Sequence, residues 1–155
     1  MSNARLKLDL KGFEKMLSQL QVAAKDIDRT ASAAVTESAK IVENELRNAA
    51  AAKGVPSDIT NQIKVNTAHQ TDKYEAEVGW QMGNYDPRNP SAGYKAIFLN
   101  YGTVRRQTQA GNNRGEIPKP SQDQQFIHMA KKAARPKVKK IQREIIKKVV
   151  EDLEK

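Results

Sequence analysis

Residues 62–81 read QIKVNTAHQTDKYEAEVGWQ, and this stretch decides the class of fold. Its second half alternates apolar and polar residues, with the apolar positions at Tyr74, Ala76, Val78 and Trp80. Such alternation is the period of a half-buried strand. The polar QTDK between the two halves leaves room for the chain to reverse, so the stretch predicts an antiparallel hairpin. We expect Trp80 to lie in the core or on a face of the sheet rather than to stack on a ligand.

On the amino-terminal side, the sequence predicts a short strand and a long helix. RLKLDLKG, at residues 5–12, alternates leucines with polar residues. From there the apolar residues recur at helical spacing, mainly Phe13, Leu17, Leu20, Ala24, Ile27, Ala31, Ala34, Val35, Val42, Leu46 and Ala49. This pattern is typical of an amphipathic helix, or of two nearly collinear helices with a break near residues 26–28. The glycine and proline of AKGVPSD, at residues 52–58, are expected to end it.

On the carboxy-terminal side, a turn-rich loop leads into KAIFLNYGT at residues 95–103, which predicts a short buried helix or a third strand. Residues 104–121 show no periodicity and are predicted to form a long basic loop. Loops of that length in a compact domain are usually functional or disordered until bound. Helical spacing returns from about residue 122 to residue 154, interrupted at Pro136, where we expect a kink or a division into two helices.

The whole pattern predicts one domain, residues 5–155, of the α+β class. We expect a small antiparallel sheet of three to four strands, packed against the long N-terminal helix and a C-terminal helix. The length of 155 residues is that of a single domain with a sizeable core.

The chain is basic, with 27 Lys and Arg against 18 Asp and Glu, for a formal charge of +9. Ten Lys or Arg and four Asp or Glu lie between Lys131 and Lys155, so much of the excess belongs to the terminal helix. One interpretation is a solvated helix face that keeps the protein soluble. The other is a surface that faces phosphate or an acidic partner.

The sequence carries no recognisable catalytic chemistry. It has no cysteine and only two histidines, and neither histidine has a second one at metal-binding spacing. The carboxylates lie mostly among lysines on helical segments, and there is no nucleophile elbow or phosphate-binding glycine loop. We therefore expect no enzymatic activity, no cofactor and no metal. No apolar run approaches the roughly 18 residues of a membrane span, and no signal-peptide pattern is present, so we expect the protein to fold in the cytoplasm.

The order of the elements resembles the tail-completion and head-tail joining (neck) proteins of long-tailed bacteriophages. The resemblance spans nearly the whole chain, from GFEKMLSQL through AIFLNYGT to IPKPSQDQQFIHMA. In that family an aromatic residue and a Gly-Thr pair end one segment, and a proline-containing stretch later introduces a phenylalanine that opens the last helix. The matching positions are Asn100, Tyr101, Gly102, Thr103, Pro118, Pro120 and Phe126. This sequence departs from the pattern at Asn100, where an acidic residue is frequent, and in its long loop after Thr103.

The resemblance implies a structural virion protein of an active phage or a prophage remnant. We expect it to assemble as a homo-oligomeric ring of six copies in the neck or tail, at the head-tail joint or at the head-proximal end of the tail tube. Its implied partners are tail-tube and head-closure proteins, with transient contact to DNA in the lumen. We expect Gly102 to allow a tight turn and Thr103 to bond a nearby backbone group, with Phe98, Leu99 and Tyr101 anchored in the core. The assembly candidates are Asn100, Tyr101, Gly102, Thr103, Arg105, Arg106, Arg114 and Phe126. The DNA-facing candidates are Arg105, Arg106, Lys131, Lys132 and Arg135. The alternatives are a free-standing nucleic-acid-binding protein, and a loop whose arginines only keep it solvated.

Overall fold

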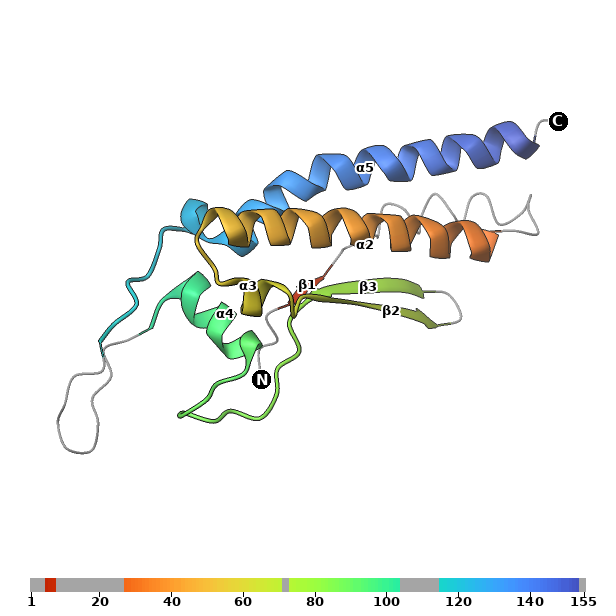
Figure 1. The fold of residues 1–155 in the computed structure, drawn as a ribbon. Helices are drawn as coiled ribbons and strands as arrows, with labels where there is room; N and C mark the ends of the chain where they lie inside the picture. Colours follow the sequence, from red (N-terminus) through yellow and green to blue (C-terminus); the bar gives the residue numbers. More distant parts are fainter. Residues whose placement is uncertain (1–4, 8–26, 71–72, 104–114, 154–155) are drawn as a thin grey trace.

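The computed structural model describes residues 5–7, 27–70, 73–103 and 115–153. In chain order, their elements are β1 (Arg5–Lys7), α2 (Ile27–Ala52), α3 (Ser57–Thr60), β2 (Lys64–Gln70), β3 (Lys73–Gly79), α4 (Ala92–Tyr101), the 3-10 turn η1 (Gln122–Gln124) and α5 (Phe126–Leu153). Two long helices and a small antiparallel sheet make an α+β fold, which confirms the predicted class (Figure 1).

Helix α2 forms the middle layer, with α5 along one side of it and the sheet along the other (Figure 1). The two helices run antiparallel: Lys137 bonds Glu45, and further along α5 Gln142 Nε2 donates to Ser38 Oγ at 3.4 Å. A helix covered on both sides needs small apolar residues on more than one face, because its neighbours must approach closely. The alanines of α2 meet this need, and the fully buried ones are Ala31, Ala34, Ala39 and Ala50.

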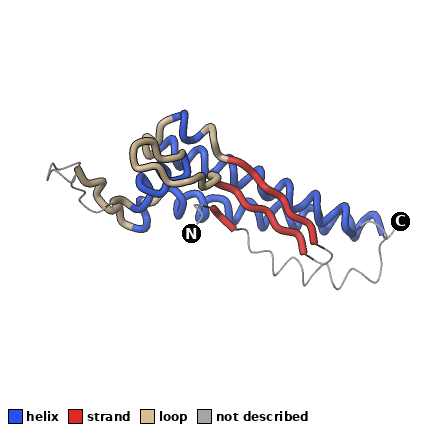
Figure 2. The backbone as a smooth tube through the Cα atoms, turned by 90° about the horizontal axis from the view of Figure 1, so that it is seen from below, coloured by secondary structure: helices blue, strands red, loops and turns tan. Residues whose placement is uncertain are grey.

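In the sheet, β3 lies between β1 and β2 and pairs antiparallel with both (Figure 2). The register of the β2–β3 hairpin places Val65 opposite Val78. Tyr74, Ala76 and Val78 are buried on the side of β3 that packs against α2, while the residues between them are less buried. The predicted hairpin is therefore confirmed, and one face of the sheet contributes to the core.

Trp80 directly follows β3 and joins three parts of the core. Its indole Nε1 donates a 2.7 Å hydrogen bond to the carbonyl oxygen of Ile59 in α3. Its ring meets that of Phe126, at the start of α5, edge-on with centroids 6.0 Å apart. Both side chains are almost completely buried. Trp80 is thus a core residue, as expected.

The structure decides between the alternatives at two places. The segment KAIFLNYGT forms most of α4, so the helix is present here and the segment adds no strand to the sheet. Helix α5 is continuous through Pro136, so the division into two helices is wrong. Pro136 is exposed, so water can bond the carbonyl group that its missing N–H leaves free.

The remaining predictions concern the ends of the long helices and the long loop. Gly54 follows the end of α2 with φ 71°, the left-handed conformation expected at a helix C-terminus. The terminal helix begins at Phe126, after η1, rather than near residue 122. The predicted helix over residues 13–26, and residues 104–114 of the predicted loop, lie outside the described residues.

Candidate assembly site

Helix α4 buries one face and leaves another open. Its buried residues include Ala92, Ala96 and Asn100, which follow one another at spacings of four. Tyr94, Phe98 and Tyr101 share a second face, because they stand at spacings of four and three. The helix conformation therefore turns Asn100 into the protein and leaves Tyr101 46% exposed.

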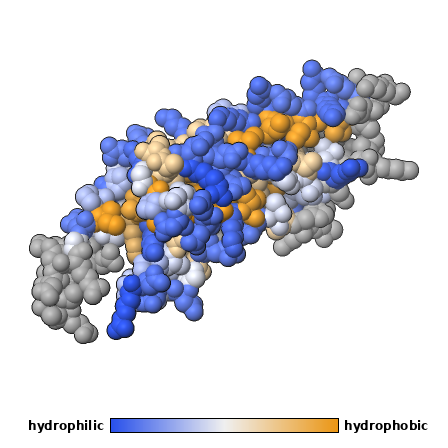
Figure 3. All heavy atoms as spheres, viewed as in Figure 1, coloured by the Kyte–Doolittle hydropathy of each residue, from blue (hydrophilic) through white to orange (hydrophobic). Residues whose placement is uncertain are grey.

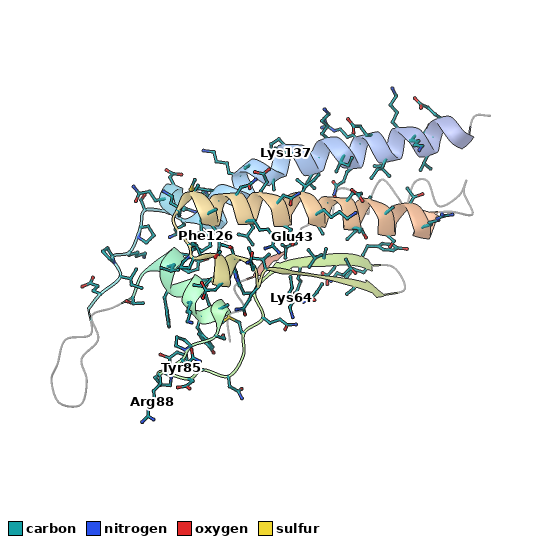
Figure 4. All side chains as sticks on the ribbon, viewed as in Figure 1. Glu43, Lys64, Tyr85, Arg88, Phe126 and Lys137 are labelled. Carbon is teal, nitrogen blue, oxygen red and sulfur yellow. The ribbon has the colours of Figure 1, made fainter. Side chains whose placement is uncertain are left out.

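The open face of α4 continues onto the preceding loop through Tyr85. The ring of Tyr85 meets Tyr94 edge-on at 4.9 Å between centroids, and it meets Phe98 at 6.5 Å. Figure 4 shows Tyr85 on the loop beside α4, on the side away from α5. We call Tyr85, Tyr94, Phe98 and Tyr101 the aromatic face. The large hydrophobic residues that are exposed in the described part of the chain are Tyr85, Leu99 and Tyr101, so all of them lie on or beside this face.

This arrangement corrects the expected burial of the α4 segment. Leu99 is 36% exposed and Tyr101 46% exposed, so neither anchors the following loop in the core. Asn100 is buried in their place. Tyr85 and Tyr94 were not among the predicted site residues. The signal for Tyr94 was the aromatic spacing at 94, 98 and 101, which becomes visible only when the segment is taken as a helix. Tyr85 lies on the preceding loop, and its contact with Tyr94 depends on the tertiary fold.

Gly102 ends α4 with a turn that needs glycine. Its φ is 76°, and its N–H donates to the carbonyl oxygen of Phe98 at 2.9 Å. A Cβ atom here would lie 2.7 Å from the Ile117 carbonyl oxygen and 2.7 Å from the Lys119 Cα. The predicted turn at Gly102 is present, and it also allows the returning chain to pass directly over the end of α4.

Thr103 directly precedes the predicted loop of residues 104–121 and bonds Ile117 within it. The Thr103 N–H donates to the Ile117 carbonyl oxygen at 2.8 Å, and the Ile117 N–H donates to Thr103 Oγ1 at 3.1 Å. The expectation that Thr103 bonds a nearby backbone group is therefore correct. These two bonds join residues 103 and 117, which we call the loop base, beside the end of α4.

Asn100 links α4 to the start of α5. Its Oδ1 accepts a 3.0 Å hydrogen bond from the N–H of Ile127, one of the N–H groups in the first turn of α5 that have no partner within the helix. Its Nδ2 is buried without a hydrogen-bond partner in the described structure. The neighbouring Phe126 is buried against Trp80. Asn100, Gly102, Thr103 and Phe126 thus meet at one end of the molecule, where they hold the loop base and α5 in place.

The predicted basic residues divide into two groups. Lys131, Lys132 and Arg135 are exposed on α5. Arg105, Arg106 and Arg114 lie outside the described residues, so their positions relative to the aromatic face are not part of the described geometry. Within the described residues, no three His, Cys, Asp or Glu side chains gather as metal ligands would.

The described fold thus has two packed helices over a small sheet, with the partly exposed aromatic face on α4 and the loop before it. The family model described as "Bacteriophage HK97-gp10, putative tail-component" matches residues 14–102, more than half of the chain. The protein belongs to this family of bacteriophage tail components. No curated protein and no solved structure matches the chain.

The family assignment makes the protein a structural component of a phage virion. The match includes α2, α3, the hairpin and α4, and it ends at Gly102, the turn that leads into the loop. In the described part of the chain, none of the helices has the length and apolarity to cross a membrane.

Proposed function

We propose that the protein forms a homo-oligomeric ring of six copies, at the head-tail joint or at the head-proximal end of the tail tube. In this role it contacts tail-tube and head-closure proteins and performs no catalysis. The observation that carries the proposal is the aromatic face, since a phage tail component functions within an assembly and this face is open for contact.

The described surface offers the two unlike contact regions that a ring needs. In a closed ring, each subunit joins its neighbour through two different surfaces. The aromatic face is one candidate, because grouped exposed aromatic residues mark interaction sites more often than scattered ones do. The outer edge of β2 is the other, since β2 lies at the edge of the sheet and pairs only with β3 within the described residues.

The loop base is placed to contribute to the same contact. Thr103 bonds Ile117 directly after α4, so the described residues on either side of 104–114 lie near the end of the helix that carries Tyr101. We propose that Arg105, Arg106 and Arg114 extend from this base to a neighbouring subunit or a partner ring. The alternative of a free-standing nucleic-acid-binding protein is less favoured, because the family is one of tail components.

The test compares self-association of the wild-type protein with that of the double variant Tyr85→Ser/Tyr101→Ser. We expect light scattering after size-exclusion chromatography, with negative-stain imaging, to show a discrete ring for the wild-type protein. The double variant should remain monomeric, because it removes the two most exposed aromatic rings of the face. The matched control Tyr101→Phe keeps the ring system and should still assemble.

If the double variant forms rings at the same protein concentrations as the wild-type protein, the aromatic face is not part of the interface. A wild-type protein that stays monomeric, both alone and with purified tail tubes, would contradict the ring itself. Circular dichroism of each variant ensures that a loss of assembly is not a loss of folding.

A further inference from the structure

We propose that the outer face of α5 binds the phosphate backbone of duplex DNA. The face consists of Lys132, Arg135, Lys139 and Arg143, which stand at spacings of three, four and four and so share one side of the helix. All four are exposed, and they lie within a stretch of seven Lys or Arg, from Lys131 to Arg143, that contains no Asp or Glu. We call these four residues the basic face. Figure 3 shows hydrophilic side chains along the outer edge of α5.

The basic face has no ion pair in the described structure, whereas other lysines of α5 do. Lys137 bonds Glu45 of α2, and Lys140 and Lys147 each lie near the carboxylate four residues further on. The four residues of the basic face form no such pair with a described side chain. Arg135, Lys139 and Arg143 are also like charges at successive i,i+4 positions, an arrangement that destabilises a helix. A bound polyanion would remove this repulsion.

The chemistry of the face favours nucleic acid over a protein partner. Protein interfaces have cores rich in aromatic residues and poor in charge, and the exposed large hydrophobic residues of the described chain lie on or beside the aromatic face, not here. Single-stranded nucleic acid would need exposed aromatic rings for its bases to stack on. The aromatic residue of α5 is Phe126, which is 2% exposed. Cations without aromatic residues are suited to contacts with the phosphates of a duplex, which position a protein without reading sequence.

The dimensions of the face set the expected strength of binding. Eleven residues separate Lys132 from Arg143, which corresponds to about 16 Å of helix at about 1.5 Å per residue. A duplex carries one charge per ~1.7 Å of its axis, so phosphates are available all along this length. Four phosphate contacts predict a slope of about −3.6 for log K against log salt concentration, and a dissociation constant in the range of 10⁻⁴ to 10⁻⁶ M that is typical of non-specific binding.

The experiment measures fluorescence anisotropy of a labelled 25-base-pair duplex of random sequence, titrated with the full-length protein between 50 and 200 mM NaCl. Over this range we expect the wild-type affinity to fall by about 150-fold, which is what a slope of −3.6 gives. The test variant neutralises the basic face and is Lys132→Gln/Arg135→Gln/Lys139→Gln/Arg143→Gln. Glutamine is a good helix former, so α5 should keep its structure.

The control variant removes the same amount of charge from exposed residues elsewhere and is Lys53→Gln/Lys64→Gln/Arg88→Gln/Lys119→Gln. We expect the control to keep nearly all of the wild-type salt dependence, and the basic-face variant to lose measurable binding or to reduce the slope by about 3.6. Circular dichroism shows whether each variant is folded. If the quadruple variant does not fold, Lys139→Gln/Arg143→Gln should remove about half of the slope.

Three outcomes would overturn the proposal. The first is no binding by the wild-type protein at 50 mM NaCl and 0.1 mM protein. The second is an equal loss of affinity in the two quadruple variants, which would assign binding to net charge alone. The third is that polyglutamate of matched charge displaces the duplex more effectively than unlabelled DNA does, which would make an acidic protein the partner. The comparison between the two quadruple variants does not depend on ring formation, because the basic face belongs to the single subunit.

Discussion

At the scale of the residue, Gly102 carries the most specific requirement of the candidate site. The position needs a positive φ and also room for the returning chain at residues 117–119. Gly54 shares the first requirement, with φ 71°, but a Cβ atom there would meet nothing within 4 Å. Alanine substitutions at the two glycines therefore separate two contributions to the free energy of unfolding, one from the backbone conformation and one from steric conflict.

We predict that Gly102→Ala is much more destabilising than Gly54→Ala. A left-handed conformation costs an alanine about 1–2 kcal/mol, and both variants incur this cost. At Gly102 the new methyl group must also displace the backbone of Ile117 and Lys119, which should add about 2 kcal/mol or more. Urea unfolding followed by circular dichroism measures both free energies. Equal losses in the two variants would show that the returning chain does not press on the end of α4.

The residue scale also shows where sequence reasoning reached its limit. The turn at Gly102 and the side-chain bond of Thr103 were predictable, because glycine and threonine carry those properties locally. The burial of Asn100 and the exposure of Tyr101 were not, since they depend on the choice between helix and strand. The sequence predicted either a short buried helix or a third strand at residues 95–103, so it did not predict which side chains are buried. The helix that forms here buries Asn100 and exposes Tyr101.

At the scale of the element, local periodicity was sufficient for the hairpin, for the described part of the first long helix, residues 27–52, and for the presence of the terminal helix. Alternation in residues 62–81 and helical spacing on either side are signals carried within each segment. Local periodicity does not predict the order in which the helices and the sheet are layered. That α2 is the middle layer follows from its contacts with both α5 and the sheet, and these depend on the tertiary fold.

The antiparallel pairing of α2 and α5 can be tested through Lys137 and Glu45. Lys137 is 59% exposed and Glu45 15% exposed, so the carboxylate of this pair is largely shielded from water. The pair of Lys40 and Glu37, within α2, has a lysine of similar exposure but a carboxylate that is 48% exposed. Screening by solvent should therefore weaken the pair within α2 more than the pair between the helices.

We predict a coupling free energy of about 0.5–1 kcal/mol between Lys137 and Glu45, against less than about 0.5 kcal/mol between Lys40 and Glu37. Each value comes from a double-mutant cycle of alanine substitutions, measured by urea unfolding at low salt. If the interhelical coupling is absent while the coupling within α2 persists, α5 does not lie against α2 in the described register.

At the scale of the whole molecule, the core extends beyond the part of the chain that matches the family. The match ends at Gly102, whereas Phe126, Ala130, Ala134 and Val138 of α5 are buried together with residues of α2 and the sheet. Helix α5 is therefore an integral layer of the fold. Its two sides differ, since the side toward α2 is buried in the core and the basic face is exposed.

This division of α5 predicts opposite outcomes for two adjacent substitutions. Ala134 is 2% exposed and packs in the core, while Ala133 is exposed. Ala134→Asp would place an unpaired carboxylate between the helices, and we expect a loss of about 3 kcal/mol or more in the free energy of unfolding. Ala133→Asp changes the same residue types in the same turn and should cost less than about 1 kcal/mol, mostly through helix propensity.

Urea unfolding of the two variants, followed by circular dichroism and by Trp80 fluorescence, measures this difference. The fluorescence is informative because Trp80 contacts Phe126 at the start of α5, so it reports on the docking of this helix. Equal stabilities would mean that α5 does not pack against α2 as a layer of the core. A large loss confined to Ala134→Asp, with both signals changing in one transition, would establish that α5 folds together with the family-matching part of the chain as one cooperative unit.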